Sequence, residues 1–230
     1  MSINENVMAI RQVIADAAKK SGRNSADIKL IGVTKTIDAN RVKELLAAGV
    51  TDFGESRVQE FLPKREILKN ETTYPHQWHF IGHLQRNKVK HVVDNVDTIH
   101  SVDSLPLAQE INRCCEKLGR QIKILAEINI AGESSKFGIP PSEILEFVKN
   151  LVNMRGVRLS GLMCLPPFVE NPDENRVFFE KMQKISVDIL SKCIYDTDKL
   201  DLSMGTSGDF SVAIEHGATM VRIGTAIFEA

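Results

Sequence analysis

Short apolar segments alternate with longer stretches of helical hydrophobic spacing along almost the whole chain. The first stretch, residues 3–20, places Val7, Ile10 and Ile14 on one helical face and ends at Ser21-Gly22, a typical helix stop. Eight strands are predicted after it, at residues 29–34, 52–54, 78–81, 98–102, 122–130, 159–165, 200–204 and 220–224. Seven intervening helices are predicted at about residues 39–48, 56–69, 87–93, 104–118, 141–153, 175–192 and 208–216.

This regular alternation indicates an α/β protein with a parallel sheet. Eight such units in 230 residues match a single-domain (β/α)8 TIM barrel with an extra N-terminal helix at residues 3–20. No linker rich in Gly, Ser or Pro and no charge block divides the chain, so residues 1–230 are expected to form one domain. A doubly wound open sheet is the alternative, because the segments at 52–54 and 78–81 are very short for strands.

Composition restricts the classes of function. With 29 basic and 30 acidic residues the formal net charge is -1, which gives no electrostatic footprint for nucleic acid or an anionic membrane. No apolar run approaches the roughly 20 residues that span a bilayer, and the N-terminus lacks the features of a secretion signal. A cytoplasmic protein with reduced thiols is expected, because its four cysteines follow no metal or redox spacing: Cys114, Cys115, Cys164 and Cys193.

Lys35 closes the first predicted strand and has the clearest chemical meaning. In parallel α/β proteins, ligands bind at the carboxyl ends of the strands. The stem of Lys35 would lie along a buried element, and partial burial of its amine would favour the neutral form, which attacks an aldehyde to give a Schiff base. The alternative is an ordinary strand-end lysine whose amine reaches water while its stem packs.

Two later loops have the character of a phosphate site. Residues 204–209, Met-Gly-Thr-Ser-Gly-Asp, follow the seventh strand and open a helix, so backbone N–H groups and the Ser207 hydroxyl would face an anion. Gly224 and Thr225 follow the eighth strand. The loops after strands seven and eight form the recurring phosphate site of TIM barrels.

Arg222 lies in the eighth strand, just before this phosphate loop, where alternation would point it into the barrel mouth. The alternative role for Arg222 is a structural ion pair with a strand-end carboxylate such as Glu127. An aldehyde-reactive lysine, a phosphate cradle and a cation between them predict a pocket for pyridoxal 5'-phosphate (PLP), in which the cation faces the ring nitrogen.

Seven segments of the chain match one family in the same order: residues 33–36, 53–60, 78–88, 134–138, 161–163, 202–205 together with Ser207 and Asp209, and 221–228. Through them the sequence resembles the YggS/PROSC family of pyridoxal phosphate homeostasis proteins, which are single-domain relatives of the alanine racemase barrel. The resemblance implies that Lys35 carries the Schiff base. It also implies that Ser207 and the backbone of Gly224 and Thr225 hold the phosphate, while Arg222 meets the pyridine nitrogen.

Two departures from the family pattern bear on this site. Ser56 replaces a usual Asn, so a polar contact there would be shorter or absent, and Thr206 replaces a usual Met and would add a hydroxyl to the cradle. His79 and His83 have the i, i+4 spacing of helical zinc ligands, but they flank a strand-to-loop segment, so structural hydrogen bonding or a role in shaping the pocket rim is expected. No metal is expected.

The predicted cofactor site comprises Lys35, Ser56, His79, Met204, Thr206, Ser207, Arg222, Gly224 and Thr225.

These residues favour a carrier of the cofactor over an enzyme. PLP withdraws electrons best when its ring nitrogen is protonated, which an arginine opposite that nitrogen disfavours, so transamination and decarboxylation are not expected. Racemisation needs a base on each face of the α-carbon. The two tyrosines, Tyr74 and Tyr195, lie in segments away from the predicted mouth, and the second domain of racemases is missing.

The leading hypothesis is a non-catalytic protein that carries or buffers PLP in vitamin B6 and amino-acid homeostasis. Its expected partners are PLP and PLP-dependent apo-enzymes, and it is expected to be a monomer, because the domain that completes a racemase dimer is lacking. The alternative is an amino-acid racemase of the alanine racemase class. A third hypothesis is a barrel that engages protein or RNA partners, with the cofactor only structural.

Overall fold

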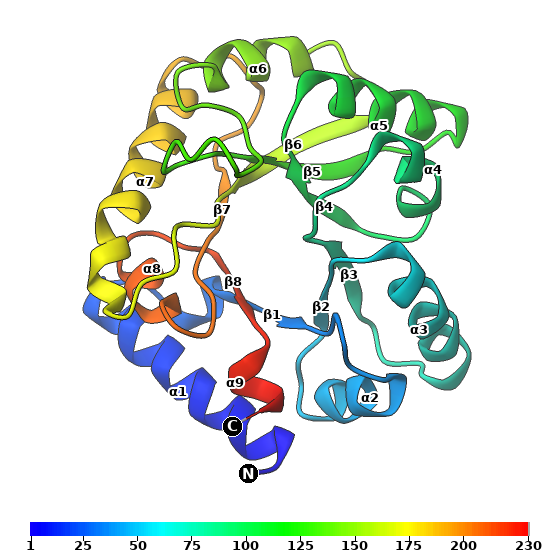
Figure 1. Cartoon of the computed structure of the whole chain (residues 1–230), viewed down its shortest axis with the longest axis vertical. Helices are drawn as coiled ribbons and strands as arrows, with labels where there is room; N and C mark the ends of the chain where they lie inside the picture. The colour runs from blue at the N-terminus through cyan, green and yellow to red at the C-terminus, as the bar shows by residue number, and fades with distance from the viewer. Residues whose placement is uncertain (230) are drawn as a thin grey trace.

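Eight parallel strands close into one barrel in the computed structural model, which describes residues 1–229 (Figure 1). Each strand pairs with its neighbours in chain order, and the last pairs with the first. The closed ring confirms the predicted (β/α)8 barrel and excludes the doubly wound open sheet. The strands are β1 (Lys29–Val33), β2 (Asp52–Glu55), β3 (Gln77–Phe80), β4 (Thr98–Val102), β5 (Ile122–Glu127), β6 (Val157–Met163), β7 (Asp201–Ser203) and β8 (Met220–Ile223).

Helices surround the ring of strands on its outer side (Figure 1). They are α1 (Ile3–Lys20), α2 (Ala39–Ala47), α3 (Val58–Glu71), α4 (Val89–Val92), α5 (Leu105–Lys117), α6 (Ile144–Leu151), α7 (Arg176–Ser191), α8 (Phe210–Glu215) and α9 (Thr225–Phe228). The sequence did not predict α9, because four residues are too few to show a helical period.

Some predicted strands extend too far. The fifth was expected to reach residue 130, but β5 ends at Glu127, where the chain leaves the sheet and forms an isolated bridge between Ile128 and Ile139. The seventh was expected over five residues, but β7 keeps only Asp201–Ser203. In both cases apolar residues continue beyond the ladder and pack in loops, so hydrophobic pattern alone overestimates strand length.

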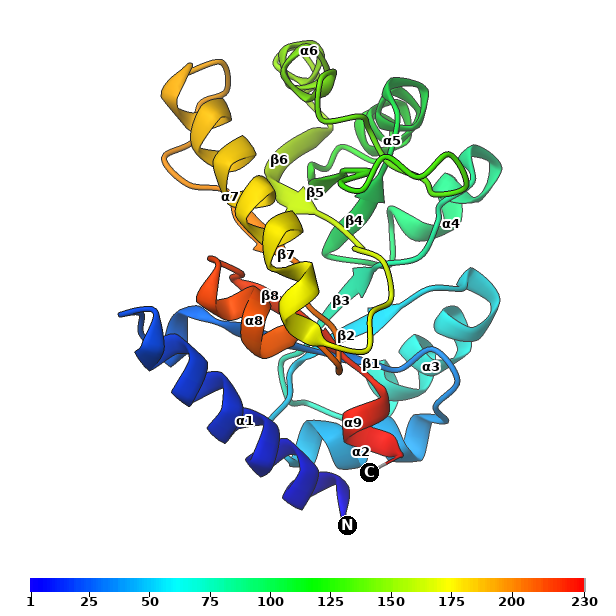
Figure 2. The ribbon, with the colours of Figure 1, turned by 60° about the vertical axis from the view of Figure 1, so that its left-hand side comes forward.

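The extra helix α1 lies along α8 and α9, beside the first strand (Figures 1 and 2). Ser2 and Glu5 form a capping box at its start, which satisfies backbone N–H groups that the first turn leaves free. The Asn6 side chain donates a hydrogen bond of 3.0 Å to the carbonyl of Ile227 in α9. This contact ties the last helix, which follows β8, to the first.

Most of the apolar core lies between the strands and the surrounding helices, in one continuous cluster. The barrel interior has a much smaller apolar cluster, formed by Ile31, Leu125, Met163 and Met220. Much of the remaining interior is polar and buried, and includes His79, His100, Ser203 and Arg222.

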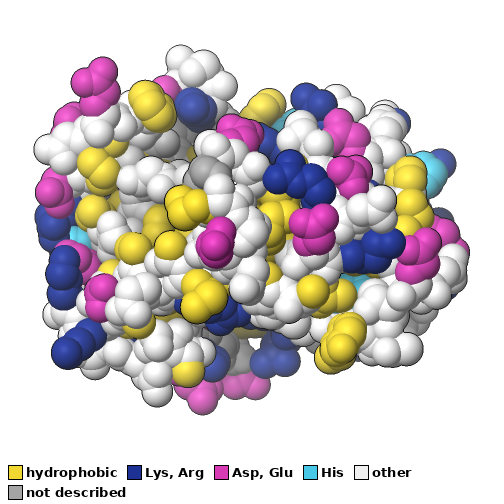
Figure 3. Space-filling view, turned by 90° about the horizontal axis from the view of Figure 1, so that it is seen from below, with side chains coloured by type: hydrophobic (Ala, Val, Ile, Leu, Met, Phe, Trp, Pro, Cys, Tyr) yellow, Lys and Arg dark blue, Asp and Glu magenta, His cyan; other side chains and the backbone are white. Residues whose placement is uncertain are grey.

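On the face nearest both chain termini, basic and acidic side chains are interspersed, with apolar side chains scattered between them (Figure 3). Among residues 1–229, no helix combines the length and the apolar character that crossing a bilayer requires.

Candidate functional site

A cavity of about 470 Å³ opens at the carboxyl ends of the strands, where the sequence placed the site. It is bordered by the loops after β1, β2, β3, β6, β7 and β8. Seven of the nine predicted residues line it: Lys35, Ser56, Thr206, Ser207, Arg222, Gly224 and Thr225.

The structure places His79 and Met204 elsewhere. His79 is buried within the barrel, where its two ring nitrogens lie 2.9 Å from Asp52 and from His100. Met204 is fully buried, and its N–H donates to the carbonyl of Met220. Neither side chain lines the cavity. For His79, the structure shows the structural hydrogen bonding that the sequence offered as the alternative to a place at the rim.

Lys35 lies just beyond β1 at the cavity, and its side chain is exposed. Within residues 1–229 its amine makes no hydrogen bond or ion pair. The expectation that the amine is shielded from water is therefore wrong for the protein without ligand. The strand ends at Val33 and the chain turns outward, so only the preceding residues are buried.

The residue before Lys35 is held tightly, although Lys35 itself is exposed. Thr34 is buried, its hydroxyl donates to Glu55 Oε1 at 2.7 Å, and its carbonyl accepts from Lys64 Nζ at 2.6 Å. Lys64 also forms a buried ion pair with Glu55, at 2.5 Å. The backbone that carries the reactive amine is thus anchored to β2 and α3.

The loops after β7 and β8 present backbone N–H groups to the cavity. Those of Ser207, Gly208 and Thr225 have no acceptor in the described part of the chain. Ser207 Oγ accepts from the N–H of Ala226 at 3.3 Å, which brings the two loops together and leaves the hydroxyl hydrogen available. A Cβ at Gly208 would meet nothing within 4 Å, so the loop is open there. Free N–H groups converging from two loops suit a phosphate.

In the loop at residues 204–209, Asp209 holds the backbone in place through hydrogen bonds. The Asp209 carboxylate accepts from the N–H of Thr206 at 2.7 Å and from its hydroxyl at 3.1 Å, and Asn175 donates to the same carboxylate at 2.9 Å. Because the Thr206 hydroxyl already donates to Asp209, it is not free to donate to a phosphate. Gly205 adopts φ +91°, and a Cβ there would lie 2.7 Å from the Cβ of Ala213, so the turn requires glycine.

Arg222 is the cation at the base of the cavity and is 4% exposed. Its Nη1 donates to the carbonyl and the hydroxyl of Ser203, both at 2.6 Å, and its Nη2 donates to the carbonyl of Cys164 at 2.9 Å. Burial lowers the pKa of Arg222 from its ordinary value. No carboxylate of residues 1–229 lies within 4.0 Å of it, so the alternative ion pair with Glu127 is not formed.

Sequence reasoning missed the apolar part of the site. Ile37, Ile81, Leu165, Phe168 and Phe228 also line the cavity. Leu165 and Phe168 are 46% and 95% exposed, and they belong to a loop whose Leu-Pro-Pro-Phe sequence gives no period that would mark it as functional. Large exposed apolar side chains beside a cavity provide a wall for a flat ring.

The residues present therefore fit PLP. An accessible primary amine, converging N–H groups, a buried guanidinium and apolar walls surround one cavity. Each matches one part of that molecule: the aldehyde, the phosphate, the ring nitrogen and the ring face.

Known proteins resemble this chain over nearly its full length. The model of a family described as alanine racemase, N-terminal domain, matches residues 6–230. A pyridoxal phosphate homeostasis protein of Aquifex aeolicus is 39% identical over 228 residues, which cover 99% of this chain and 98% of the relative. A structure described as an unknown protein from Bifidobacterium adolescentis is 34% identical, with a TM-score of 0.91 and coverages of 98% and 94%. PipY of Synechococcus elongatus, with PLP bound, is 29% identical, with a TM-score of 0.85 and coverages of 99% and 100%.

Proposed function

Because the chain belongs to the alanine racemase N-terminal domain family, we propose that it acts as one PLP-binding barrel that carries or buffers this cofactor in vitamin B6 and amino-acid homeostasis. The observation that carries the proposal is the cavity itself, which Lys35 lines together with two loops whose N–H groups lack acceptors among residues 1–229. The name of the Aquifex aeolicus relative and the cofactor bound to PipY support it.

Lys35 would hold the cofactor covalently and reversibly. Its neutral amine adds to the aldehyde carbon, and loss of one water leaves a Schiff base. Since Lys35 is exposed, water or a second amine can reach the same carbon and release the cofactor. Ser207 and the backbone of Gly224 and Thr225 would hold the phosphate, and Arg222 would meet the ring nitrogen.

Carrying is favoured over racemisation, because no tyrosine or histidine lines the cavity in the described residues, where Lys35 is joined only by the exposed Glu229 carboxylate just after α9. When bound, PLP supplies an electron sink for amino-acid chemistry, but racemisation also needs a base on each face of the α-carbon. Neither tyrosine is placed for this role. The Tyr195 hydroxyl accepts from the N–H of Leu159 at the start of β6, and Tyr74 precedes β3 and is 71% exposed.

The racemase alternative makes its own prediction. A racemase exchanges the α-proton of its amino-acid substrate with solvent. The purified protein, loaded with PLP, is incubated with L-alanine in deuterated water and followed by proton NMR. No exchange beyond that of free PLP is expected from a carrier, and rapid exchange would establish the racemase instead.

The carrier hypothesis also predicts who receives the cofactor. PLP-dependent apo-enzymes are the proposed recipients, with the barrel acting as a monomer whose exposed rim residues Leu165 and Phe168 leave the cavity open to an acceptor. Transfer from the loaded protein to an apo-enzyme would be followed by the recovery of that enzyme's activity.

The central experiment locates the covalent bond. The wild-type protein, Lys35→Ala and Lys136→Ala are each mixed with PLP, scanned for a Schiff-base absorption band, and reduced with borohydride. Lys136 is the matched control, because it is an exposed lysine in the loop after β5 and does not line the cavity. The band and a reduced adduct on Lys35 are expected in the wild type and in Lys136→Ala. An adduct on another residue, or an unchanged band in Lys35→Ala, would refute the assignment.

A further inference from the structure

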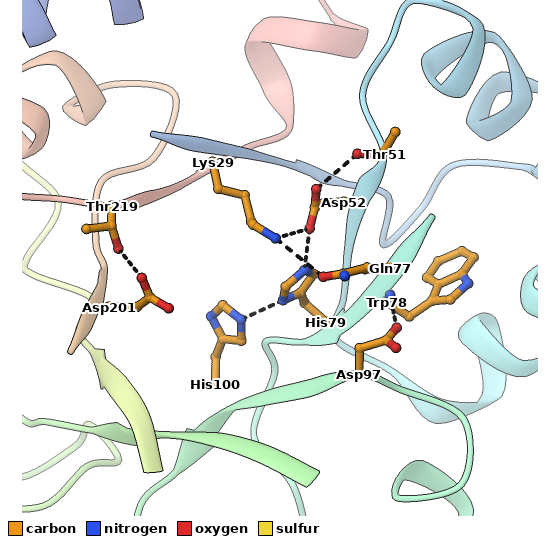
Figure 4. Close-up of polar contacts among 10 residues, drawn as sticks. All are labelled: Lys29, Thr51, Asp52, Gln77, Trp78, His79, Asp97, His100, Asp201 and Thr219. Carbon is orange, nitrogen blue, oxygen red and sulfur yellow. Dashed lines mark hydrogen bonds and ion pairs between the residues drawn. The ribbon is translucent and has the colours of Figure 1, made fainter. Parts of the chain in front are cut away.

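A continuous chain of side-chain hydrogen bonds crosses the barrel interior and ends on Arg222. Asp52 Oδ1 lies 2.9 Å from His79 Nε2, and His79 Nδ1 lies 2.9 Å from His100 Nε2 (Figure 4). His100 Nδ1 then lies 2.9 Å from Ser203 Oγ, which accepts from Arg222 Nη1 at 2.6 Å. Five strands, β2, β3, β4, β7 and β8, each contribute one residue to this chain.

Most side chains in this hydrogen-bonded chain are buried. His79, His100, Ser203 and Arg222 are each at most 4% exposed. At the other end of the barrel, Asp52 and His79 line a cavity of about 460 Å³, and Asp52 accepts from Lys29 Nζ at 2.7 Å. His100 and Ser203 line neither cavity and are fully buried, so their hydrogen bonds are satisfied within the chain.

With both imidazoles neutral, the two ends fix the direction of every hydrogen bond between them. Arg222 can only donate and the Asp52 carboxylate can only accept. The Ser203 hydroxyl therefore donates to His100 Nδ1, His100 Nε2–H donates to His79 Nδ1, and His79 Nε2–H donates to Asp52. In this arrangement each ring carries its single hydrogen on Nε2.

The charges support this direction. Burial alone would raise the pKa of Asp52, but hydrogen bonds from His79 and Lys29 outweigh it and lower the pKa to about 2. Burial, followed by nearby charge that includes Arg222, holds the pKa of His100 well below its ordinary range. Asp52 therefore stays ionised and His100 stays neutral across physiological pH.

We propose that Asp52, His79, His100 and Ser203 are positioning residues that lock Arg222 in place and thereby hold the cofactor's ring nitrogen unprotonated. This inference rests on the proposed function, in which Arg222 meets that nitrogen. Both Nη1 hydrogens are committed to Ser203 and one Nη2 hydrogen to Cys164, so the hydrogen on Nε and one on Nη2 stay free for the cavity. A guanidinium fixed in this way offers the ring nitrogen only donors.

The first test needs no cofactor. Long-range proton–nitrogen NMR of the ligand-free, histidine-labelled protein reports the tautomer of each ring. The wild type is expected to show Nε2–H at both His79 and His100. Asp52→Ala is expected to show mixed tautomers, whereas Asp52→Asn keeps the wild-type pattern, because an amide oxygen can still accept from both His79 and Lys29. A charged ring, an Nδ1–H tautomer in the wild type, or an unchanged Asp52→Ala spectrum would overturn the chain.

The second test measures the effect on the cofactor. Ser203→Ala removes the hydroxyl that joins His100 to Arg222, and we expect about tenfold weaker PLP binding, or ~1.4 kcal/mol. The absorption band of the bound cofactor should also begin to titrate with pH, since a looser guanidinium permits protonation of the ring. Ser186→Ala is the matched control, because Ser186 is also buried but donates to Gln183 in α7. Ser203→Thr, which keeps a hydroxyl, should restore the wild-type band.

The outcomes separate the two hypotheses. If wild-type protein fails to bind PLP while the tautomers are as expected, the proposed function fails and the chain stands. If wild-type protein binds PLP and Ser203→Ala matches it in affinity and pH profile, the positioning role is wrong. If Ser203→Ala does not fold, Asp52→Ala, altered at the half-exposed end of the chain, takes its place with the same expected loss of affinity and change in pH profile.

Discussion

Glu127 is expected to make the folded protein less stable as pH rises. It ends β5, is 8% exposed, and its carboxyl has no hydrogen-bond or ion-pair partner among the described residues. Burial, and then the charge of Asp103, raises its pKa from 4.5 to about 7, although Arg222 opposes this shift. In the unfolded chain the pKa returns to an ordinary value of about 4.3.

The sign follows from the proton count. Between about pH 4.5 and pH 7 the folded protein keeps a proton on Glu127 that the unfolded chain has released, so this carboxyl contributes less stability as pH rises. The contribution is full below the unfolded pKa and is lost as pH passes the folded one. The total loss is about 3.5 kcal/mol, since each unit of difference between the folded and unfolded pKa corresponds to about 1.4 kcal/mol.

Glu127→Gln removes this titration. In urea unfolding of the ligand-free protein, we expect the variant to gain about 2–3 kcal/mol over the wild type between pH 5 and pH 8. Glu146→Gln, which alters an exposed glutamate in α6, is the control and should follow the wild type at both pH values. Parallel curves for wild type and Glu127→Gln would show that the buried carboxyl keeps an ordinary pKa and would refute the reasoning.

Two further predictions concern the anchoring of the site. Lys64→Met leaves the buried Glu55 carboxylate without its cation and should cost about 3–5 kcal/mol in urea unfolding, whereas adding Glu55→Gln should recover most of the loss. A loss below 1 kcal/mol would mean that the pair is not desolvated. Gly82→Ala places a Cβ 2.4 Å from the carbonyl of Ser56 and should lower stability by about 1–3 kcal/mol in the same assay, whereas Gly208→Ala, with open space around it, should not.

The order of elements was predictable from the sequence because each unit of a (β/α)8 barrel is local. Each apolar segment and the helical stretch after it can be recognised without the rest of the sequence. Eight such units then restrict the architecture to few alternatives, of which a closed barrel is one. The same locality placed Lys35, Ser207 and Arg222 at one cavity. Each lies at or just after a strand end, and all carboxyl ends of a parallel barrel meet on one side.

The contacts and exposures that the sequence did not predict depend on how distant parts of the chain are placed relative to one another. Nothing near His79 in the sequence indicates that Asp52 and His100 will flank its ring, since they come from β2 and β4. The exposure of Lys35 depends likewise on where the β1 ladder stops, and the apolar wall at Phe168 depends on the path of an irregular loop. These are tertiary properties without a local period.

The division of the core explains how the barrel tolerates so polar an interior. Burial of apolar surface is concentrated between the strands and the helices, so most of the hydrophobic stabilisation of the fold comes from outside the ring. The small apolar cluster of Ile31, Leu125, Met163 and Met220 leaves the rest of the interior to groups with matched donors and acceptors. A guanidinium suits this position, since it stays protonated when buried and its planar donors match the carbonyls of Ser203 and Cys164. A lysine at position 222 would supply a single point charge that cannot reach both carbonyls in one plane, and it would more readily lose its proton. The chemistry proposed for the cavity thus requires an arginine, and the polar interior is what allows it to be buried there.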